Sequence, residues 1–395
     1  MLQPYWGFAH TIHEPDIVRR FYPGKTITYV VFSEDLQHNW KVATLWRPYV
    51  QVAFLPYSAG VGPKGRRFKL ASANWYRGWI PKAVRWVLKR TVRNGVPVVT
   101  ILELNEFHPS VQYPPHDKRL LEKVSPMQRL DILYLHLMRE VPAPGLHLPE
   151  RSRKRIAERL QQLVPRDRPS MQYCGLYLRQ RREYENHIGK LNRKVKPQDA
   201  ARDGSNLECY LDGVRALNRA GYQVLMTGDI PLPDEVSQEF KGLLVDAQHA
   251  GVNEQLFYLF AATESKLFVG DTGGGIWLPG IKAIPRLVLN AYPYFHGYPH
   301  SWMFYKTVRD GTGKLVDYRR LHEQHAYDFQ PEGMTIHTNT KQEITDAVVQ
   351  FLGDAQQPWV EGNASDFPEQ TFIHHARGKL SPAFSRLFSP KKVAA

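Results

Sequence analysis

A glycine triplet in the stretch VGDTGGGIWLPG, residues 269–280, is the clearest place in the chain for anion chemistry. Glycines let the backbone come close to a ligand, and successive N–H groups suit a phosphate. If a helix begins there, the amides of 272–275 face the phosphate, while the preceding acid receives sugar hydroxyls. The pattern is neither GxGxxG nor a Walker A sequence, so a purely structural turn is the alternative. The candidate residues are Asp271, Thr272, Gly273, Gly274 and Gly275.

Arginines follow another strand-like run, 171–178, in the same half of the chain. The residues are Arg179, Arg181 and Arg182. On an extended chain Arg179 and Arg181 share one side, so both guanidinium groups can fork onto a diphosphate. Fixed cations of this kind can neutralise a leaving diphosphate without a metal ion. A solvated charged loop is the alternative.

Gly228 and Asp229 end a third strand-like run, 222–228. The carboxylate of Asp229 can accept from ribose or base hydrogens, or it can simply cap a turn. In doubly wound sheets ligands bind at the carboxyl ends of the strands. We therefore expect this pair, the arginine cluster and the glycine stretch to lie together at one edge of a sheet.

A loop near the N-terminus, GFAHTIHEPD, collects proton acceptors. Histidine and carboxylate side chains can be tuned to act as a general base near neutral pH. We expect His10 to activate an acceptor hydroxyl, with Asp16 and Glu14 as the next candidates; a histidine with only a packing role is the alternative. No metal site is predicted, because the histidines lack cysteine or acidic companions at ligand spacing. No serine nucleophile elbow occurs either.

The first half of the chain alternates strands and helices, as a parallel sheet requires. We expect a short helix ending at Pro23 and Gly24, a strand over 27–32, a helix over 38–48 and a strand over 49–56. A very short opening strand should precede Gly7. Further along, 81–95, 114–141 and 149–165 are predicted as helices and 96–104 as a central strand.

The second half repeats this alternation. Strands are predicted over 171–179, 222–228, 243–247, 266–270 and 285–290, and helices over 207–223 and 253–265. Thr340 and Glu343 are spaced as a capping box in the closing segment 334–352. The polar, proline-bounded stretch 165–169 is predicted as the domain junction. The predicted domains are 1–165 and 166–355, followed by a C-terminal helix or tail over 356–395.

Composition supports two domains of a globular protein. The chain has 395 residues, 43% hydrophobic and 23% charged, and no run approaches the ~20 apolar residues of a membrane helix. No secretory signal opens it, so a cytoplasmic location is expected. The formal net charge is +14, and 61–94 forms a basic aromatic patch without acids. This patch is either a solvated face or a contact for an anionic membrane surface, an acidic glycan or a lipid-phosphate acceptor. Nucleic acid ranks last because no binding motif accompanies the charge.

The segments YLRQRREYENH, LECYLDGVRALNRAGYQVLMTGD and LFYLFAATESKLFVGDTGGGIWLPGIKAIPRLVLN together resemble a bacterial group of GT-B glycosyltransferases from surface polysaccharide clusters. The N-terminal WGFAHTIHEPDIVRRFYPG is similar to the first loop of that group. More distantly, the second half is similar to the nucleotide-binding half of fucosyltransferases with a basic H-x-R-R-type motif. The chain has Leu178 where that motif opens with histidine, and Gly273 where serine is common. The resemblance covers about two thirds of the chain.

The resemblance implies an α/β protein of GT-B type, with two Rossmann-like domains facing across a cleft and a last helix, near 367–377, that crosses back. It also implies a nucleotide sugar held mainly by the C-terminal domain. We therefore expect a glycosyltransferase that moves a sugar from this donor to a cell-envelope glycan or lipid-linked acceptor; no cofactor is expected, and the arginine cluster favours a reaction without metal. Contact with the inner membrane face through 61–94 is an additional expectation. A nucleotide-sugar epimerase or hydrolase of the same fold, and a non-catalytic glycan-binding protein, are the alternatives.

Overall fold

The computed structural model describes the chain in segments. These are residues 2–3, 8–33, 41–42, 45–56, 86, 137–138, 141–166, 171–180, 201–292, 301–316, 330–355 and 378–380. They fall into two compact units, 1–142 and 143–395, which are described one at a time. The strand predicted over 96–104, the patch 61–94 apart from Trp86, and the segment 367–377 lie outside the described residues.

The first unit contains a parallel sheet in the order β1-β2-β3. Its strands are β1 (Leu2–Gln3), β2 (Thr28–Ser33) and β3 (Gln51–Pro56), and helix α1 (Phe8–Phe21) joins the first two. The short opening strand predicted before Gly7 is therefore confirmed. The helix also ends as predicted, with Gly24 at a φ of 72° just beyond it.

Helix α1 begins earlier than the sequence indicated. It starts at Phe8 and contains Pro15, so the stretch predicted as a catalytic loop is helical. An internal proline removes one backbone hydrogen bond and normally marks a helix start, which explains the wrong boundary. Burial of Ile17, Val18 and Phe21 at helical spacing outweighs that loss.

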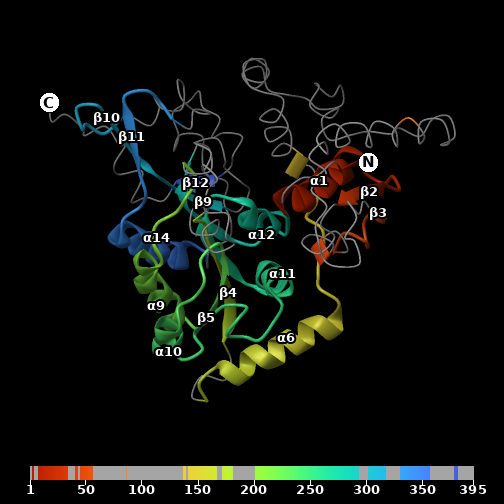
Figure 1. Ribbon diagram of the computed structural model, residues 1–395, viewed down its shortest axis with the longest axis horizontal. Coiled ribbons are helices and arrows are strands. Elements are labelled where there is room, and N and C mark those ends of the chain that lie inside the picture. The colour runs from red at the N-terminus through yellow and green to blue at the C-terminus, as the bar shows by residue number, and fades with distance from the viewer. Residues whose placement is uncertain are drawn as a thin grey trace, which may run out of the picture. The chain divides into compact units, whose positions relative to one another are not determined.

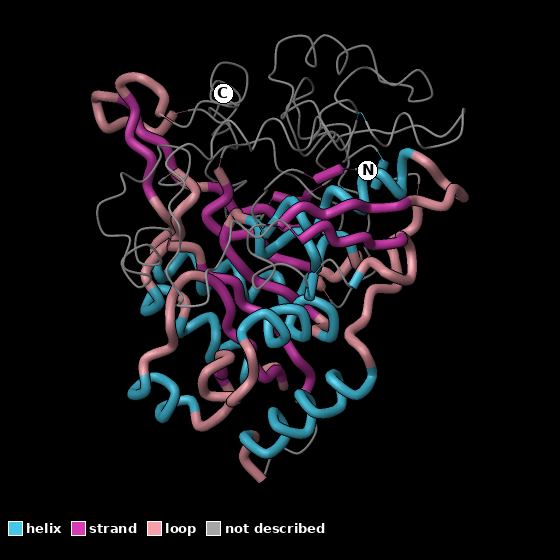
Figure 2. The backbone as a smooth tube through the Cα atoms, turned by 45° about the vertical axis from the view of Figure 1, so that its right-hand side comes forward, coloured by secondary structure: helices cyan, strands magenta, loops and turns pink. Residues whose placement is uncertain are grey.

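The second unit is built on a seven-stranded parallel sheet in the order β12-β9-β8-β7-β4-β5-β6 (Figures 1 and 2). The strands are β4 (Gln172–Leu178), β5 (Tyr222–Gly228), β6 (Leu244–Val245), β7 (Leu267–Asp271), β8 (Arg286–Ala291), β9 (Ser301–Tyr305) and β12 (Gly378–Leu380). The chain first builds outward through β4, β5 and β6, then returns to β7 beside β4 and builds the other way. This doubly wound order confirms the predicted α/β class.

Helices cover both faces of this sheet. The helices are α6 (Glu150–Leu163), α9 (Leu211–Arg219), α10 (Asp234–Phe240), α11 (Glu254–Glu264), α12 (Trp277–Ile281) and α14 (Lys341–Asp354). Helices α9, α10 and α14 lie on one side of β4 and β5, and α11 lies on the other (Figure 1). The predicted capping box of α14 is confirmed: Glu343 N donates to Thr340 Oγ1 at 3.3 Å, and Thr340 N donates to Glu343 Oε2 at 2.7 Å.

The division between the units falls after Pro142, not at the predicted junction 165–169. Helix α6 belongs to the second unit because Ile156 and Leu160 are buried and the Leu160 carbonyl accepts from Gln223 Nε2 at 3.3 Å. The prediction differed because a polar helix bounded by prolines has the sequence pattern of a linker. Of the tail 356–395, the described part is β12, which pairs with β9 in the second unit's own sheet.

The structure adds elements that the sequence did not indicate. Besides β9 and β12, an antiparallel pair is formed by β10 (Thr307–Asp310) and β11 (Met334–His337). A 3-10 turn, η3 (Gly274–Ile276), leads into α12, so a helix does follow the glycine stretch.

Candidate functional site

The predicted segments meet at the carboxyl edge of the second unit's sheet. Strand β4 lies between β5 and β7, with Leu178 opposite Gly228 and Tyr177 opposite Gly270. Arg179, Asp229 and Asp271 therefore stand at the ends of neighbouring parallel strands. The point between β4 and β7 is where the strand order reverses, which is where ligands bind in doubly wound sheets. Arg181 and Arg182 lie outside the described residues.

Asp271 is completely buried at this edge. Its Oδ2 accepts from the Arg179 backbone N–H at 2.9 Å, and its Oδ1 accepts from Tyr210 Oη at 2.5 Å and Asn290 Nδ2 at 2.9 Å. Burial raises the pKa of Asp271 to about 6, although these hydrogen bonds and the charge of Lys306 lower it. The carboxylate thus fastens β4 to β7. A direct contact with sugar hydroxyls, as predicted, would require an exposed carboxylate. In this arrangement Asp271 is buried beneath the surface of the site and holds the strand ends together.

An asparagine pair extends this network. Asn290 N donates to Asn339 Oδ1, and Asn339 N donates to Asn290 Oδ1, both at 2.6 Å. Asn339 Nδ2 also donates to the Tyr305 carbonyl at 2.9 Å. Asn290 has a φ of 49°, a region in which asparagine is enriched among non-glycine residues. The pair ties the ends of β8 and β9 to the start of α14, and the sequence offered no sign of it except asparagine at a strand end.

The glycine stretch presents its backbone amides at the same edge. Within the described part of the chain, no acceptor is found for the N–H groups of Gly274 and Gly275. The following helix α12 has only 5 residues, so we attribute anion affinity to these amides and not to a helix dipole. The geometry of these amides is thus compatible with the prediction that the amides of 272–275 face a phosphate. The contact itself stays a prediction.

Packing requires glycine at position 275 and leaves little room at position 273. A Cβ on Gly275 would lie 2.3 Å from the Tyr177 ring, and one on Gly273 would lie 3.1 Å from Arg179 Cδ. Gly228 has a φ of 117°, and its Cβ would lie 2.0 Å from the Leu178 carbonyl oxygen. Side chains are excluded here because the three strand ends approach so closely.

Gly275→Ala is expected to destabilise the second unit by about 1–3 kcal/mol, since the ring of Tyr177 must move. Urea unfolding measures the change. The matched control is Gly353→Ala in α14, where nothing lies within 4 Å of the new Cβ and alanine favours the helix. Equal midpoints for the two variants would contradict the packing reason for Gly275.

Arg179 lies partly exposed beside the buried hydroxyl of Tyr177. Burial raises the pKa of Tyr177 to about 12; the charge of Asp229 raises it further, while the charge and hydrogen bond of Arg179 lower it. Asp229 is fixed by its own N–H, which donates to the Leu178 carbonyl at 2.9 Å. One cation and one acid thus flank the hydroxyl at the strand ends, a suitable arrangement for binding both a phosphate and a sugar hydroxyl.

The predicted base candidates of the first unit lie on α1. The side chain of His10 is outside the described residues, so its role stays a prediction. Glu14 and Asp16 are fully buried. Asp16 forms ion pairs with Arg19 at 2.8 Å and Arg20 at 2.6 Å, and Arg20 also donates to the Val141 carbonyl. These contacts fix α1 to the end of the first unit and give Asp16 structural partners. The base roles of Glu14 and Asp16 stay predictions.

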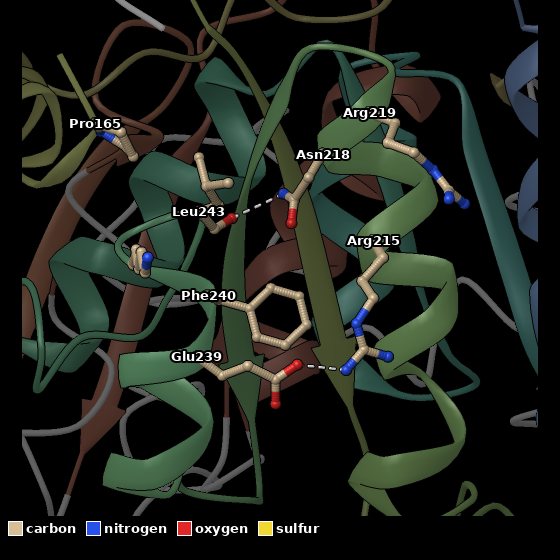
Figure 3. Close-up of a pocket in the computed structure, with 8 residues that line it drawn as sticks. Pro165, Arg215, Asn218, Arg219, Glu239, Phe240 and Leu243 are labelled. Carbon is tan, nitrogen blue, oxygen red and sulfur yellow. Dashed lines mark hydrogen bonds and ion pairs between the residues drawn. The ribbon is translucent and has the colours of Figure 1, made fainter. Parts of the chain in front are cut away.

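A pocket of about 580 Å³ lies elsewhere, between α9 and α10 (Figure 3). It opens toward the amino edge of the sheet, where Asn218 Nδ2 donates to the Leu243 carbonyl at 3.0 Å. Arg215 pairs with Glu239 across it. Both helices end here, and Arg219 and Lys241 at their C-termini offset the negative ends of the helix dipoles. This pocket is therefore explained by the fold and is not where we place the ligand.

His249 ties two loops together at the end of β6. Its Nδ1 lies 2.7 Å from Asp246 Oδ1, and its Nε2 lies 3.2 Å from Asp234 Oδ1. Asp246 Oδ2 also accepts from the Leu232 N–H at 3.2 Å, which fixes the loop after β5. Burial alone would lower the pKa of His249, but the hydrogen bonds and charges of the two aspartates outweigh it, and the pKa is raised.

The raised pKa of His249 predicts a pH dependence of stability. A folded-state pKa above the ordinary value of about 6.5 means that the stabilisation is complete below that value and is lost as pH rises through the folded pKa. We expect a loss below about 1 kcal/mol, because the pair is partly solvated. Urea midpoints of wild type and His249→Gln, measured from pH 5.5 to 8.5, should converge as pH rises. Parallel pH profiles would contradict the linkage.

Among the described residues, no group of three or more His, Cys, Asp or Glu side chains could hold a metal ion. In the same part of the chain, every helix is too short or too polar to cross a membrane.

Comparison with known proteins gives similar structures at low identity. No protein-family model and no curated protein matches the chain. The chain is similar to a glycosyl transferase family 9 structure from Veillonella parvula DSM 2008, with 13% identity, coverage of 90% of this chain and 96% of that one, and a TM-score of 0.45. It is also similar to the E. coli ADP-heptose LPS heptosyltransferase II, with 13% identity, coverage of 90% of this chain and 98% of that one, and a TM-score of 0.43. A third similar structure is an E. coli heptosyltransferase with ADP-2-deoxy-2-fluoro heptose, with 12% identity, coverage of 73% of this chain and 87% of that one, and a TM-score of 0.32. The fold assignment rests on the strand order and register, and the resemblance to fucosyltransferases stays a prediction.

Proposed function

We propose that the chain is a glycosyltransferase of GT-B architecture that moves a sugar from a nucleotide-sugar donor to a cell-envelope glycan or lipid-linked acceptor. The observation that carries the proposal is the convergence, at the reversal point of the parallel sheet, of Arg179 with the amides of Gly274 and Gly275, which have no acceptor among the described residues. A guanidinium and backbone N–H groups at this position suit a diphosphate. The adjacent Asp229 suits a donor hydroxyl.

In the proposed reaction, an acceptor oxygen forms a bond to the anomeric carbon while the bond from that carbon to the diphosphate oxygen breaks. The acceptor proton passes to a general base, for which we propose His10. The electron pair of the broken bond stays on the nucleoside diphosphate. Arg179 and the amides of the glycine stretch stabilise the charge that develops there, with Arg181 and Arg182 as further cations. Because these fixed charges replace a divalent ion, we propose that the reaction is independent of metal.

The proposed location is the cytoplasm, at the inner membrane face. A lipid-linked acceptor would be presented there, and the basic aromatic patch 61–94 suits an anionic lipid surface.

The experiment that tests this function measures donor consumption in EDTA. Purified protein is incubated with UDP-, GDP-, ADP- and CMP-sugars, with and without a cell-envelope glycan fraction. We expect one donor class to be consumed only when the acceptor is present. Consumption without acceptor would indicate a hydrolase or epimerase, and no consumption with any donor, together with no nucleotide binding, would contradict an enzyme of this class.

A further inference from the structure

Lys306 is a buried lysine at the carboxyl edge that the sequence did not single out. It directly follows β9 and is only 2% exposed. Its backbone N–H donates to the Ala291 carbonyl at 3.1 Å. The ammonium Nζ donates to the Ala201 carbonyl at 2.8 Å and to the Asp203 carbonyl. Lys306 therefore holds a segment that lies far away in the sequence.

That segment, 201–206, lies directly over the Asp271 carboxylate. A Cβ on Gly204 would be 2.0 Å from Asp271 Oδ2. The Gly204 N–H donates to the Arg179 carbonyl at 2.7 Å, and Ser205 Oγ donates to the Asn339 carbonyl at 2.6 Å. The segment thus contacts the backbone of the residue that we propose as the phosphate ligand.

The same segment also contacts the residues that directly follow β4. Gln180 Nε2 donates to the Ser205 carbonyl and to Asn206 Oδ1, both at 3.0 Å. Together with the bond from Gly204 to Arg179, these contacts join the two ends of the stretch 181–200, which begins with Arg181 and Arg182. Lys306 contacts the same segment at the carbonyls of Ala201 and Asp203.

The charges around Lys306 explain why a cation is kept there. Burial lowers its pKa to about 8, the carboxylates of Asp271 and Asp203 raise it, and Arg179 lowers it. A buried ammonium is tolerated because carbonyls and carboxylates surround it. The same ammonium compensates the buried carboxylate of Asp271, so one side chain serves both the junction and the network below it.

We propose that Lys306 is a positioning residue for an anionic ligand: it clamps 201–205 and thereby fixes the backbone from which the Arg179 side chain extends. This inference rests on the proposed function for the identity of the ligand, a nucleoside diphosphate. Lys306 itself is buried and does not touch the ligand.

A purely structural lysine is the alternative, and the chain offers a matched control for it. Lys282 is a part-buried lysine whose Nζ, like that of Lys306, donates to two backbone carbonyls, those of Leu146 at 2.7 Å and Thr263 at 2.8 Å. Burial lowers its pKa as well. It follows α12 and contacts the end of α11, so it lies at the opposite, amino edge of the sheet.

The test compares Lys306→Met with Lys282→Met by calorimetric titration of UDP, GDP, ADP and CMP, well below the melting temperature of each variant. We expect Lys306→Met to lower nucleotide affinity roughly 10-fold or more, Lys306→Arg to retain most of it, and Lys282→Met to bind as wild type. Wild-type affinity in Lys306→Met, or an equal loss in Lys282→Met, overturns the positioning role.

Amide hydrogen exchange separates this inference from the proposed function. Peptides covering 201–206 should exchange faster in Lys306→Met than in wild type and remain protected in Lys282→Met. Unchanged exchange in Lys306→Met overturns the clamp, even if wild type binds a nucleotide. If wild type binds none of the nucleotides, the proposed function and the ligand role of Lys306 both fail, while faster exchange would still identify the clamp. If Lys306→Met does not fold, Lys306→Gln takes its place.

Discussion

Arg179→Ala is expected to weaken nucleotide binding by at least about 10-fold. Arg179 is a partly exposed residue at the end of β4, and its Cδ lies 3.1 Å from where a Gly273 Cβ would lie, beside the amides of the glycine stretch. A charge-assisted contact to phosphate contributes about 1.5–3 kcal/mol, and more where it is bidentate. Calorimetric titration with nucleoside diphosphates measures the loss. The double variant with Arg181→Ala should abolish binding.

The control for this prediction is Arg219→Ala. Arg219 is an exposed arginine at the C-terminus of α9, beside the pocket at the amino edge of the sheet. Its removal changes the net charge by the same amount but should leave the affinity unchanged. Equal losses in both variants would mean that binding depends on overall charge, and unchanged affinity in Arg179→Ala would remove it from the site.

Asp271→Ala is expected to cost roughly 3 kcal/mol or more of the free energy of unfolding. The Arg179 amide, the Tyr210 hydroxyl and the Asn290 amide all lose their acceptor in a fully buried place, and the buried Lys306 loses a counter-charge. Urea unfolding, followed by circular dichroism, measures the change. Asp271→Asn should cost less, because one oxygen still accepts from Tyr210 and Asn290.

The comparison variant is Asp212→Ala. Asp212 also bonds to more than one partner, Arg215 and Lys341, but its side chain is 39% exposed. Loss of this surface pair should leave the urea midpoint almost unchanged. A small effect in Asp271→Ala as well would show that the network at the carboxyl edge does not hold the strand ends together.

The fold of the second unit was largely predictable from sequence. Runs such as 222–228 and 266–270 are apolar, bounded by glycine or charge, and alternate with helical segments, and this local pattern is enough for a parallel sheet. The division after Pro142, the edge strand β12 and the inclusion of Pro15 in α1 were not predictable. They depend on which surfaces pack together, and a short edge strand or a helix through a proline has no local signature.

Part of the candidate site could also be predicted from sequence, and part could not. Arg179, Asp229 and the glycine stretch could be placed together because carboxyl ends of parallel strands share one edge. Tyr210, Asn290, Asn339 and Lys306 escaped sequence reasoning because their contacts join residues far apart in the chain. The role expected for Asp271 changed for the same reason. The sequence around an acid at the end of a strand is the same whether its side chain faces a ligand or is buried beneath the site.

The most direct measurement of the central claim is thermal stabilisation by nucleotides in the presence of EDTA. Wild type and Arg179→Ala are melted side by side against UDP, GDP, ADP and CMP. A ligand that binds only the folded state raises the melting temperature in a saturable way. We predict such a rise for at least one nucleotide with wild type and its loss in Arg179→Ala. No rise with any nucleotide, or an equal rise in both proteins, would contradict a nucleotide site at this edge of the sheet.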